Sequence, residues 1–327
     1  NTIVFNNIAS RMGSGAVSAF DWGYRLMNIP ETLIGSAMGF VVFPTLAALS
    51  ELGDLEHKRR AMSGAVRFIL IATIPAAAGL ILIGRPMIGL LERGAFDARD
   101  SALVYGALQF FAFGLIFQSV HEVVARSFYA DKDTFTPLWV SIIAAVVNML
   151  IVGGLYLGFV GRMDDTLRAS FVTWGERYLG GDFAAAFDAL ASASAQVTAT
   201  LASLTGVGGL ALGYSAIFLI ELGILLVILR RRWGGIDEGA LISTTLRTIA
   251  ATGVMSIAVV AADSVLGRLG WHDAGIVLSA ARVLGLAVVG AGVFAVSALA
   301  FGVQELRALP RLVLRRRSAA PLEEAGI

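Results

Sequence analysis

Long apolar runs separated by short polar connections make up most of the chain. A helix needs about 20 mainly apolar residues to cross a lipid bilayer, and a shorter run at about 1–12 predicts a partial helix at the start. We expect an all-α polytopic membrane protein with about seven full transmembrane helices plus one partial helix. The full spans are predicted at about 14–50, 66–91, 101–125, 137–160, 206–229, 241–266 and 276–303.

These elements group into four segments along the chain. Residues 1–160 hold the partial helix and four spans, 161–205 form a long connection, 206–303 hold three spans, and 304–327 form a basic tail. Pro30 is expected to kink or break the first full span, since proline removes a backbone hydrogen bond. Polar connections are predicted at Glu51–Arg60 and at Glu92–Asp100.

The long connection at 161–205 carries its own apolar pattern. Four large residues share one helical face, and Gly180-Gly181 separates them from a second stripe. The pattern predicts two short amphipathic helices lying at the outer membrane surface; the alternative is a tethered Ala/Ser-rich linker. The first face consists of Leu167, Phe171, Trp174 and Tyr178.

Composition agrees with a membrane protein and excludes several other classes. Hydrophobic residues make up 57% of the 327 residues, charged residues 15%, and the mean hydropathy is +0.78, whereas a soluble domain is about 25% charged. A net charge of +1 gives no reason to expect a nucleic-acid partner. The absence of cysteine excludes disulfides and thiolate metal sites. The chain begins at Asn1 within an apolar run, so we expect it to be the C-terminal portion of a longer protein.

The distribution of lysine and arginine predicts the orientation, because cytoplasmic connections carry an excess of both. Alternate connections fall into two sets that hold thirteen and seven such residues. The richer set includes Glu51–Arg60, Arg230–Arg232 and the tail with Arg315–Arg317, and we expect it to be cytoplasmic.

The first full span carries a polar stripe that an ordinary lipid-facing helix would not need. Its members recur at alternating steps of four and three residues, which places them on one helical face. An ionised group at bilayer depth costs at least about 2.5–3.5 kcal/mol, so it normally faces protein or a wet cavity. One interpretation is a cavity wall; the other is an Asp21–Arg25 pair that neutralises itself and only holds helices together. The stripe consists of Ser14, Ser18, Asp21, Arg25, Asn28, Thr32 and Ser36.

Residues typical of enzymes or metal sites do not form a recognisable set. His57, His121 and His272 show no metal-ligand spacing, so each is expected at a surface or interface. We predict no metal and no cofactor. Asn148 is best explained by an interhelical hydrogen bond, whereas Glu221 is either a site for a coupling ion or proton or a hydrogen-bonded packing residue.

Two blocks of sequence resemble a known family. The stretch GAVSAFDWGYRLMNIPETLIGSAMGFVVFPTLAAL at 15–49 and the stretch RSFYADKDTFTP at 126–137 are similar to the MurJ/MviN lipid II flippases. That resemblance implies a fourteen-helix fold of two lobes in the multidrug/oligosaccharidyl-lipid/polysaccharide exporter superfamily. It implies a transporter of the bacterial inner membrane that moves the undecaprenyl-pyrophosphate-linked peptidoglycan precursor outward by alternating access. This chain would then run from the seventh helix to the fourteenth, with the N-terminal lobe missing.

The resemblance also implies which residues contact the substrate. Arg25 matches the family's cavity arginine, and its planar fork suits phosphate oxygens. Tyr24 stands where an acidic residue often precedes that arginine, so Asp21 one turn earlier is expected to take over the pairing. Asn28 occupies another polar position of the family, and we add Ser18 and Thr32 from the same stripe. The lipid tail is expected to stay among membrane lipids, along a groove formed by the last two helices.

Two alternatives remain open from the sequence. A related exporter of another lipid-linked oligosaccharide or of drugs would keep the fold and change the cargo. A membrane glycosyltransferase or polymerase using the same lipid would need a catalytic carboxylate in an outer loop. Neither Glu92–Asp100 nor Asp164-Asp165 has a convincing partner for that role.

Overall fold

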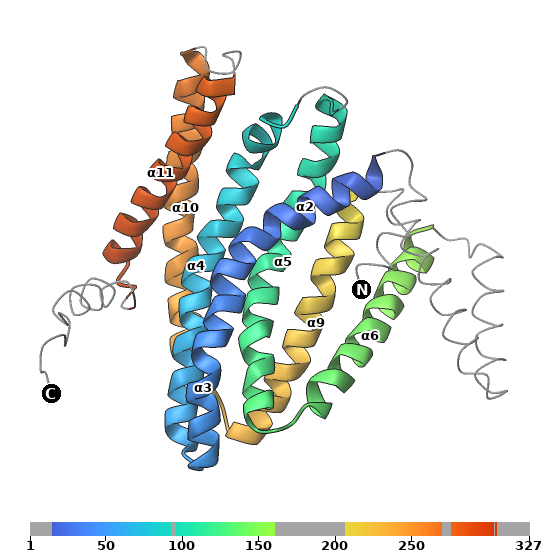
Figure 1. Cartoon of the computed structure of the whole chain (residues 1–327), viewed down its shortest axis with the longest axis vertical. Helices are drawn as coiled ribbons and strands as arrows, with labels where there is room; N and C mark the ends of the chain where they lie inside the picture. The colour runs from blue at the N-terminus through green and yellow to red at the C-terminus, as the bar shows by residue number, and fades with distance from the viewer. Residues whose placement is uncertain (1–14, 93–95, 161–206, 270–275, 304, 306–327) are drawn as a thin grey trace, which may run out of the picture.

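The computed structural model describes residues 15–92, 96–160, 207–269, 276–303 and 305, with the backbone alone described at 149–160. Every regular element in this part of the chain is helical (Figure 1). The elements are α2 (Ala16–Glu31), η1 (Thr32–Ser36), α3 (Ala37–Glu51), α4 (Leu55–Gly89), α5 (Ala98–Ala130), α6 (Phe135–Val160), α9 (Val207–Trp233), α10 (Glu238–Arg268) and α11 (Ile276–Ala300). The predicted partial helix at 1–12, the connection at 161–205 and the tail from 306 lie outside the described residues.

Each of the seven predicted full spans corresponds to a helix or, for the first, to the continuous run α2–η1–α3. Among the described residues, six of these are long and apolar enough to cross a membrane. The seventh, α6, has 26 residues, of which Phe135–Asn148 form a shorter apolar helix. The all-α polytopic prediction is therefore confirmed.

The first span stays helical through Pro30 but changes direction, as the slanted α2 and the steeper α3 show in Figure 1. Immediately after this proline the backbone widens into the five-residue π-helix η1. Proline cannot donate to the residue four positions earlier, and a π turn absorbs such a disturbance without ending the helix. The expected kink is present and the alternative, a break, is not.

The connection predicted at Glu51–Arg60 is much shorter than expected. α4 already begins at Leu55, where the Asp54 carboxylate accepts a hydrogen bond from the backbone N–H of His57 at 3.1 Å. This N-cap starts the helix before the apolar run. With 35 residues, α4 is about 52 Å long at 1.5 Å per residue, so its charged first turns extend beyond an apolar core of about 30 Å. Likewise, Asp97 and Asp100 form a capping box that ends the predicted Glu92–Asp100 loop early.

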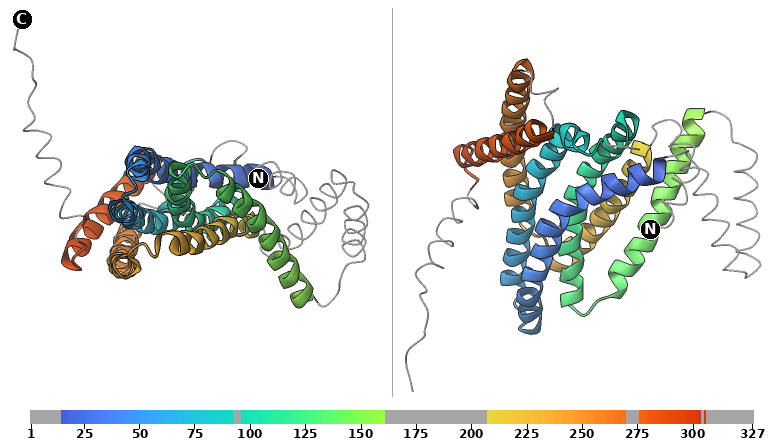
Figure 2. Two further views of the ribbon diagram at one scale, coloured as in Figure 1. Left: turned by 90° about the horizontal axis from the view of Figure 1, so that it is seen from below. Right: turned by 45° about the horizontal axis from the view of Figure 1, so that its top comes forward.

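Helix α5 lies at the centre of the lobe. It packs against α9, α4 and α2, and its neighbours surround it in Figure 1 and in both views of Figure 2. Near one end, the rings of Phe20, Phe111 and Tyr214 meet edge to face, with centroids 5.1 Å apart for Phe20–Phe111 and 5.6 Å for Phe111–Tyr214. A second apolar cluster around Met62 and Phe128 fills the other end.

Small residues let α5 approach the first span closely, as the Gly35-x-x-x-Gly39 spacing predicts. A Cβ added to Gly35 would lie 2.8 Å from the Cα of Ser119, and one added to Gly39 would lie 2.8 Å from the guanidinium of Arg126. The helix pair α10–α11 lies to one side against α4, while α6 leans away from α5 at the other side (Figure 2). The polar positions of α2 are thus held on a helix that packs closely on α5.

Candidate functional site

Helix α2 presents its two faces to different surroundings. The face that packs on α5 carries small and apolar residues together with Glu31. The polar stripe lies on the opposite side of the helix, where Ser18, Arg25 and Thr32 are exposed and Asp21 and Asn28 are partly exposed. Ser14 lies outside the described residues. The stripe therefore faces away from the core of the lobe and is open to a ligand or to another part of the protein. The packed face consists of Ala16, Ala19, Phe20, Gly23, Met27, Glu31 and Gly35.

Asp21 and Arg25 do not form an ion pair within the part of the chain that the structure describes. The geometry gives no support to the interpretation in which the two charges only neutralise each other. Arg25 instead directs an exposed guanidinium from the open face of α2. A guanidinium in this position offers a planar fork of donors that matches the oxygens of a phosphate.

Glu221 is buried inside the lobe and paired. The carboxylate is 5% exposed, and its Oε2 lies 3.1 Å from Nε2 of His121 on α5. Ser141 on α6 also interacts with this carboxylate. His121, which the sequence places at a surface or interface, is partly buried at the contact between α5 and α9, with 18% of its side chain exposed. Sequence reasoning missed the pair because the two residues are a hundred positions apart and neither helix shows a polar stripe.

Glu31 is a second buried carboxylate. Sequence reasoning missed this residue, whereas it had named Glu221. It is 4% exposed, and the Ser36 hydroxyl donates to its two oxygens at 3.3 and 3.4 Å. The sequence feature that could have indicated it is a carboxylate within an apolar span, three residues after Asn28 and off the polar stripe.

Asn148 donates to the carbonyl oxygen of Gly213 at 3.5 Å, so the predicted interhelical hydrogen bond is present but long.

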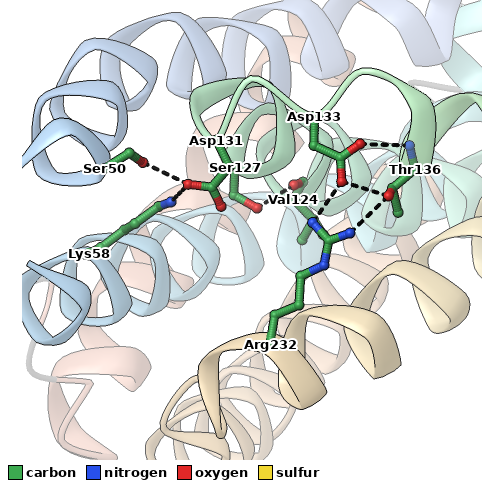
Figure 3. A network of polar contacts seen from close by, with 8 residues as sticks. All are labelled: Ser50, Lys58, Val124, Ser127, Asp131, Asp133, Thr136 and Arg232. Atoms are coloured by element: carbon green, nitrogen blue, oxygen red, sulfur yellow. Dashed lines mark hydrogen bonds and ion pairs between the residues drawn. The ribbon is translucent and has the colours of Figure 1, made fainter. Parts of the chain in front are cut away.

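The block at 126–137 forms a polar network at one end of the lobe (Figure 3). Asp131 accepts a hydrogen bond from Ser50 at 2.9 Å and pairs with Lys58 of α4. Asp133 accepts from the backbone N–H of Thr136 at 2.9 Å and pairs with Arg232 of α9 at 2.6 Å. The short α5–α6 turn thereby fixes the ends of α3, α4, α6 and α9.

Electrostatics at this turn follow from the same contacts. Burial opposes ionisation of Asp133, but hydrogen bonds from Thr136 and the charge of Arg232 outweigh it and lower its pKa to about 2. Asp133 is therefore fully ionised at neutral pH.

His57 lies exposed beside Asp54, with 2.7 Å between Nδ1 and Oδ2, as expected for a surface histidine. His272 lies outside the described residues, and within them no three His, Asp or Glu side chains are placed to hold a metal.

The last two helices enclose an apolar groove of about 510 Å³. An ion pair joins them beside it, with Arg282 Nε donating to Asp263 Oδ1 at 2.8 Å. The groove has the apolar lining expected of a place for a lipid chain. Its lining residues are Ala261, Ala262, Val265, Leu266, Ala281, Gly285, Leu286 and Val289.

Comparison with known proteins decides the family. The family model described as "Lipid II flippase MurJ" matches residues 1–163. These residues place the chain in the MurJ family. The chain is 33% identical over 149 residues to "Probable lipid II flippase MurJ" of Rhizobium tropici, covering 45% of this chain and 28% of the relative. It is 32% identical over 149 residues to "Lipid II flippase MurJ" of Burkholderia cenocepacia, covering 45% of this chain and 29% of the relative.

A solved structure supports the same assignment at the level of the fold. The structure, described as "Lipid II flippase MurJ, inward closed conformation", superposes with a TM-score of 0.60 at 18% sequence identity. The match covers 96% of this chain and 51% of the solved protein, so the chain spans about half of that protein's length. Together with the spans, membership of the MurJ family makes this a multi-pass protein of the bacterial cell membrane.

Proposed function

We propose that the chain is the C-terminal lobe of a lipid II flippase. The complete protein moves the undecaprenyl-pyrophosphate-linked peptidoglycan precursor from the inner to the outer leaflet by alternating access, without covalent chemistry. The observation that carries the proposal is the open polar face of α2, where Arg25 projects away from the lobe in a chain of the MurJ family. The missing N-terminal lobe would face this stripe and complete a cavity around the substrate.

The polarity of the cargo explains why such a cavity is needed. A pyrophosphate with a sugar-peptide head cannot cross hydrocarbon unaided, because each ionised group at bilayer depth costs several kcal/mol. Arg25 offsets that cost by binding phosphate oxygens through two parallel charged hydrogen bonds. Asp21, Asn28, Ser18 and Thr32 provide hydrogen-bonding groups on the same face for the sugar-peptide head. The apolar tail stays in the bilayer, where the α10–α11 groove offers a lining for it.

The test is replacement of Arg25 in the complete protein. Arg25→Ala should lower flipping at least about tenfold, because a charged hydrogen bond contributes about 1.5–3 kcal/mol and 1.4 kcal/mol is a factor of ten. Arg25→Lys should rescue poorly, since a point charge cannot form two parallel hydrogen bonds. Membrane abundance should stay normal, because no ion pair is broken. Flipping is measured as precursor on the outer leaflet, and Arg60→Ala, which removes an exposed arginine beyond the membrane, is the matched control.

The double variant Asp21→Asn, Arg25→Gln separates substrate contact from simple charge pairing. If Arg25 binds the pyrophosphate, this variant is abundant and inactive. If Arg25 served only to neutralise Asp21, Arg25→Ala would strand a carboxylate and reduce abundance, and the double variant would restore a working protein. A stable, fully active double variant contradicts the proposed role of Arg25.

A further inference from the structure

The interior of the lobe contains more acidic side chains than the polar stripe requires. On α5, His121 and Glu122 are adjacent in sequence and reach different partners. His121 contacts Glu221 on α9 at 3.1 Å, whereas Glu122 lies 3.7 Å from Arg126 one turn later. Glu122 also interacts electrostatically with the buried Glu31 of α2. Helices α2, α5 and α9 thus contribute titratable groups that interact across helix boundaries.

Tyr214 of α9 connects the two sides of this group. Its ring lies 5.5 Å from the ring of Tyr24 on α2 and 5.3 Å from that of Phe218. Both Glu31 and Glu221 are near enough to interact electrostatically with its hydroxyl. The buried carboxylates of α2 and α9 therefore lie within electrostatic range of the same hydroxyl.

The charges of this cluster do not balance without protons. Its members are His121, Glu122, Glu221, Glu31 and Arg126, and the tyrosines Tyr24 and Tyr214 are neutral. Glu122 has a side chain 35% exposed and pairs with Arg126. With every carboxylate ionised and the histidine neutral, the two buried charges of Glu31 and Glu221 have no lysine or arginine within ion-pair distance in the described part of the chain. Uncompensated charge in a low-dielectric interior is costly, so neutrality requires two protons shared among the histidine and the carboxylates.

The contacts around the carboxylates are suited to holding those protons. The 3.1 Å separation between His121 Nε2 and Glu221 Oε2 is a hydrogen-bond distance, so one proton can lie between the two atoms. Ser141 interacts with Glu221, and the Ser36 hydroxyl lies within hydrogen-bond distance of both oxygens of Glu31. Each carboxylate therefore has a hydroxyl beside it. Arg126 remains charged and stacks on the Phe40 ring, with 4.1 Å to the centroid.

We propose that Glu221, His121 and Glu31 form a proton-binding site inside the lobe, with protons as the ligand that completes its charge balance. A second consequence rests on the proposed function. Glu31 immediately precedes the π-helix η1 and lies on the same helix as Arg25, so release of its proton alters the helix that lines the cavity. Flipping should accordingly depend on the protonation of this site.

The site is tested directly by infrared difference spectroscopy on the purified complete protein in lipid nanodiscs, without transport. A buried protonated carboxyl gives a carbonyl band that is present at neutral pH and shifts in D₂O. We expect this band in the wild type, and we expect Glu221→Gln or Glu31→Gln to reduce it by a third or more. Glu56→Gln, which changes an exposed carboxylate on the first turns of α4, is the matched control and should leave it unchanged.

Two results would overturn the proposal. One is a wild-type protein without a protonated-carboxyl band at neutral pH, and the other is a wild-type band that disappears when sodium replaces choline as the cation of the buffer. The second result would assign the missing positive charge to a metal cation. Both readouts use the wild type, so they hold even if a variant fails to fold.

A separate measurement of flipping between pH 5.5 and 8.5 tests the link to transport. Glu221→Gln should flatten the profile, and an unchanged profile with the infrared band intact would refute the link while leaving the site standing.

Discussion

At the scale of single residues, the polar side chains of this lobe divide into exposed, buried and end-of-helix groups. Arg25 and its neighbours are available on the open face of α2, whereas Glu31 and Glu221 are enclosed by helices. Asp133 belongs to the third group, where a carboxylate between Thr136 and Arg232 joins two helix ends. The same residue type therefore stands in three different environments: open to solvent, enclosed by apolar helices, or fixed between two helix ends.

Asp133 gives a prediction with a defined pH range. Because its folded pKa of about 2 lies below the usual value of about 3.9 for an unfolded chain, its ionised form stabilises the fold above that usual value. Asp133→Ala should destabilise the complete protein at pH 7 by about 1 kcal/mol, as for loss of a helix-capping side chain. The difference in melting temperature from the wild type should shrink as pH falls from 4 towards 2. Glu51→Ala, an exposed acid at the same end, should show no such dependence, and a constant Asp133→Ala difference down to pH 2 would contradict the role of this contact.

At the scale of elements, the first span depends on a close approach between η1 and α5. Gly35 lies in the π-helix and meets the Cα, Cβ and Oγ of Ser119 within 2.8 Å of where a Cβ would be placed. The partner atoms include backbone, which cannot move aside as a flexible side chain does. The π turn and the glycine together bring α2 and α3 onto α5 on either side of η1.

Gly35→Ala should therefore destabilise the protein even though alanine favours helices. Forcing a methyl group into a packed contact costs about 1–3 kcal/mol, which exceeds the gain of about 1 kcal/mol from replacing a helical glycine. Gly64→Ala on α4 is the matched control, because a Cβ there meets no atom within 4 Å, and it should leave the protein unchanged or slightly more stable. Thermal unfolding of both variants gives the comparison, and equal melting temperatures would show that the α2–α5 contact adjusts freely.

At the scale of the whole molecule, alternate connections between the spans gather on one side. The Ser50–Asp131, Lys58–Asp131 and Arg232–Asp133 contacts place the ends of α3, α4, α5, α6 and α9 together. Arg247 of α10 donates to the carbonyl of Gly302, which joins the end of α11 to the start of α10. This grouping is the one that the lysine and arginine distribution predicts for the cytoplasmic side.

The assignment of that side to the cytoplasm is tested with single cysteines, since the native chain has none. An impermeant thiol reagent on intact cells should label Arg99→Cys at the start of α5 and should not label Arg60→Cys at the start of α4. After permeabilisation both should react, because both positions are exposed. Labelling of Arg60→Cys alone in intact cells would reverse the orientation.

The amino-acid sequence alone is enough to predict the number and order of the spans, the all-α class, the polar stripe of α2 and the family. These properties follow from length, apolar runs and helical periodicity, which are local along the chain. Spans in lipid satisfy their own backbone hydrogen bonds, so each can be recognised without its neighbours. The helix starts at Leu55 and Ala98 were placed too late, because capping by Asp54 and Asp97 lengthens a helix into polar sequence.

Which polar residues meet becomes visible only when the helices are packed together. The His121–Glu221 pair and the enclosure of Glu31 depend on which helix faces pack together. Helix association in lipid is driven by close packing and interhelical hydrogen bonds rather than by a sequence-local apolar face, so a single charged residue within an apolar run gives no sign of its partner. Glu221 therefore remained ambiguous in the sequence, and its burial beside His121 became visible only once α9 was packed on α5.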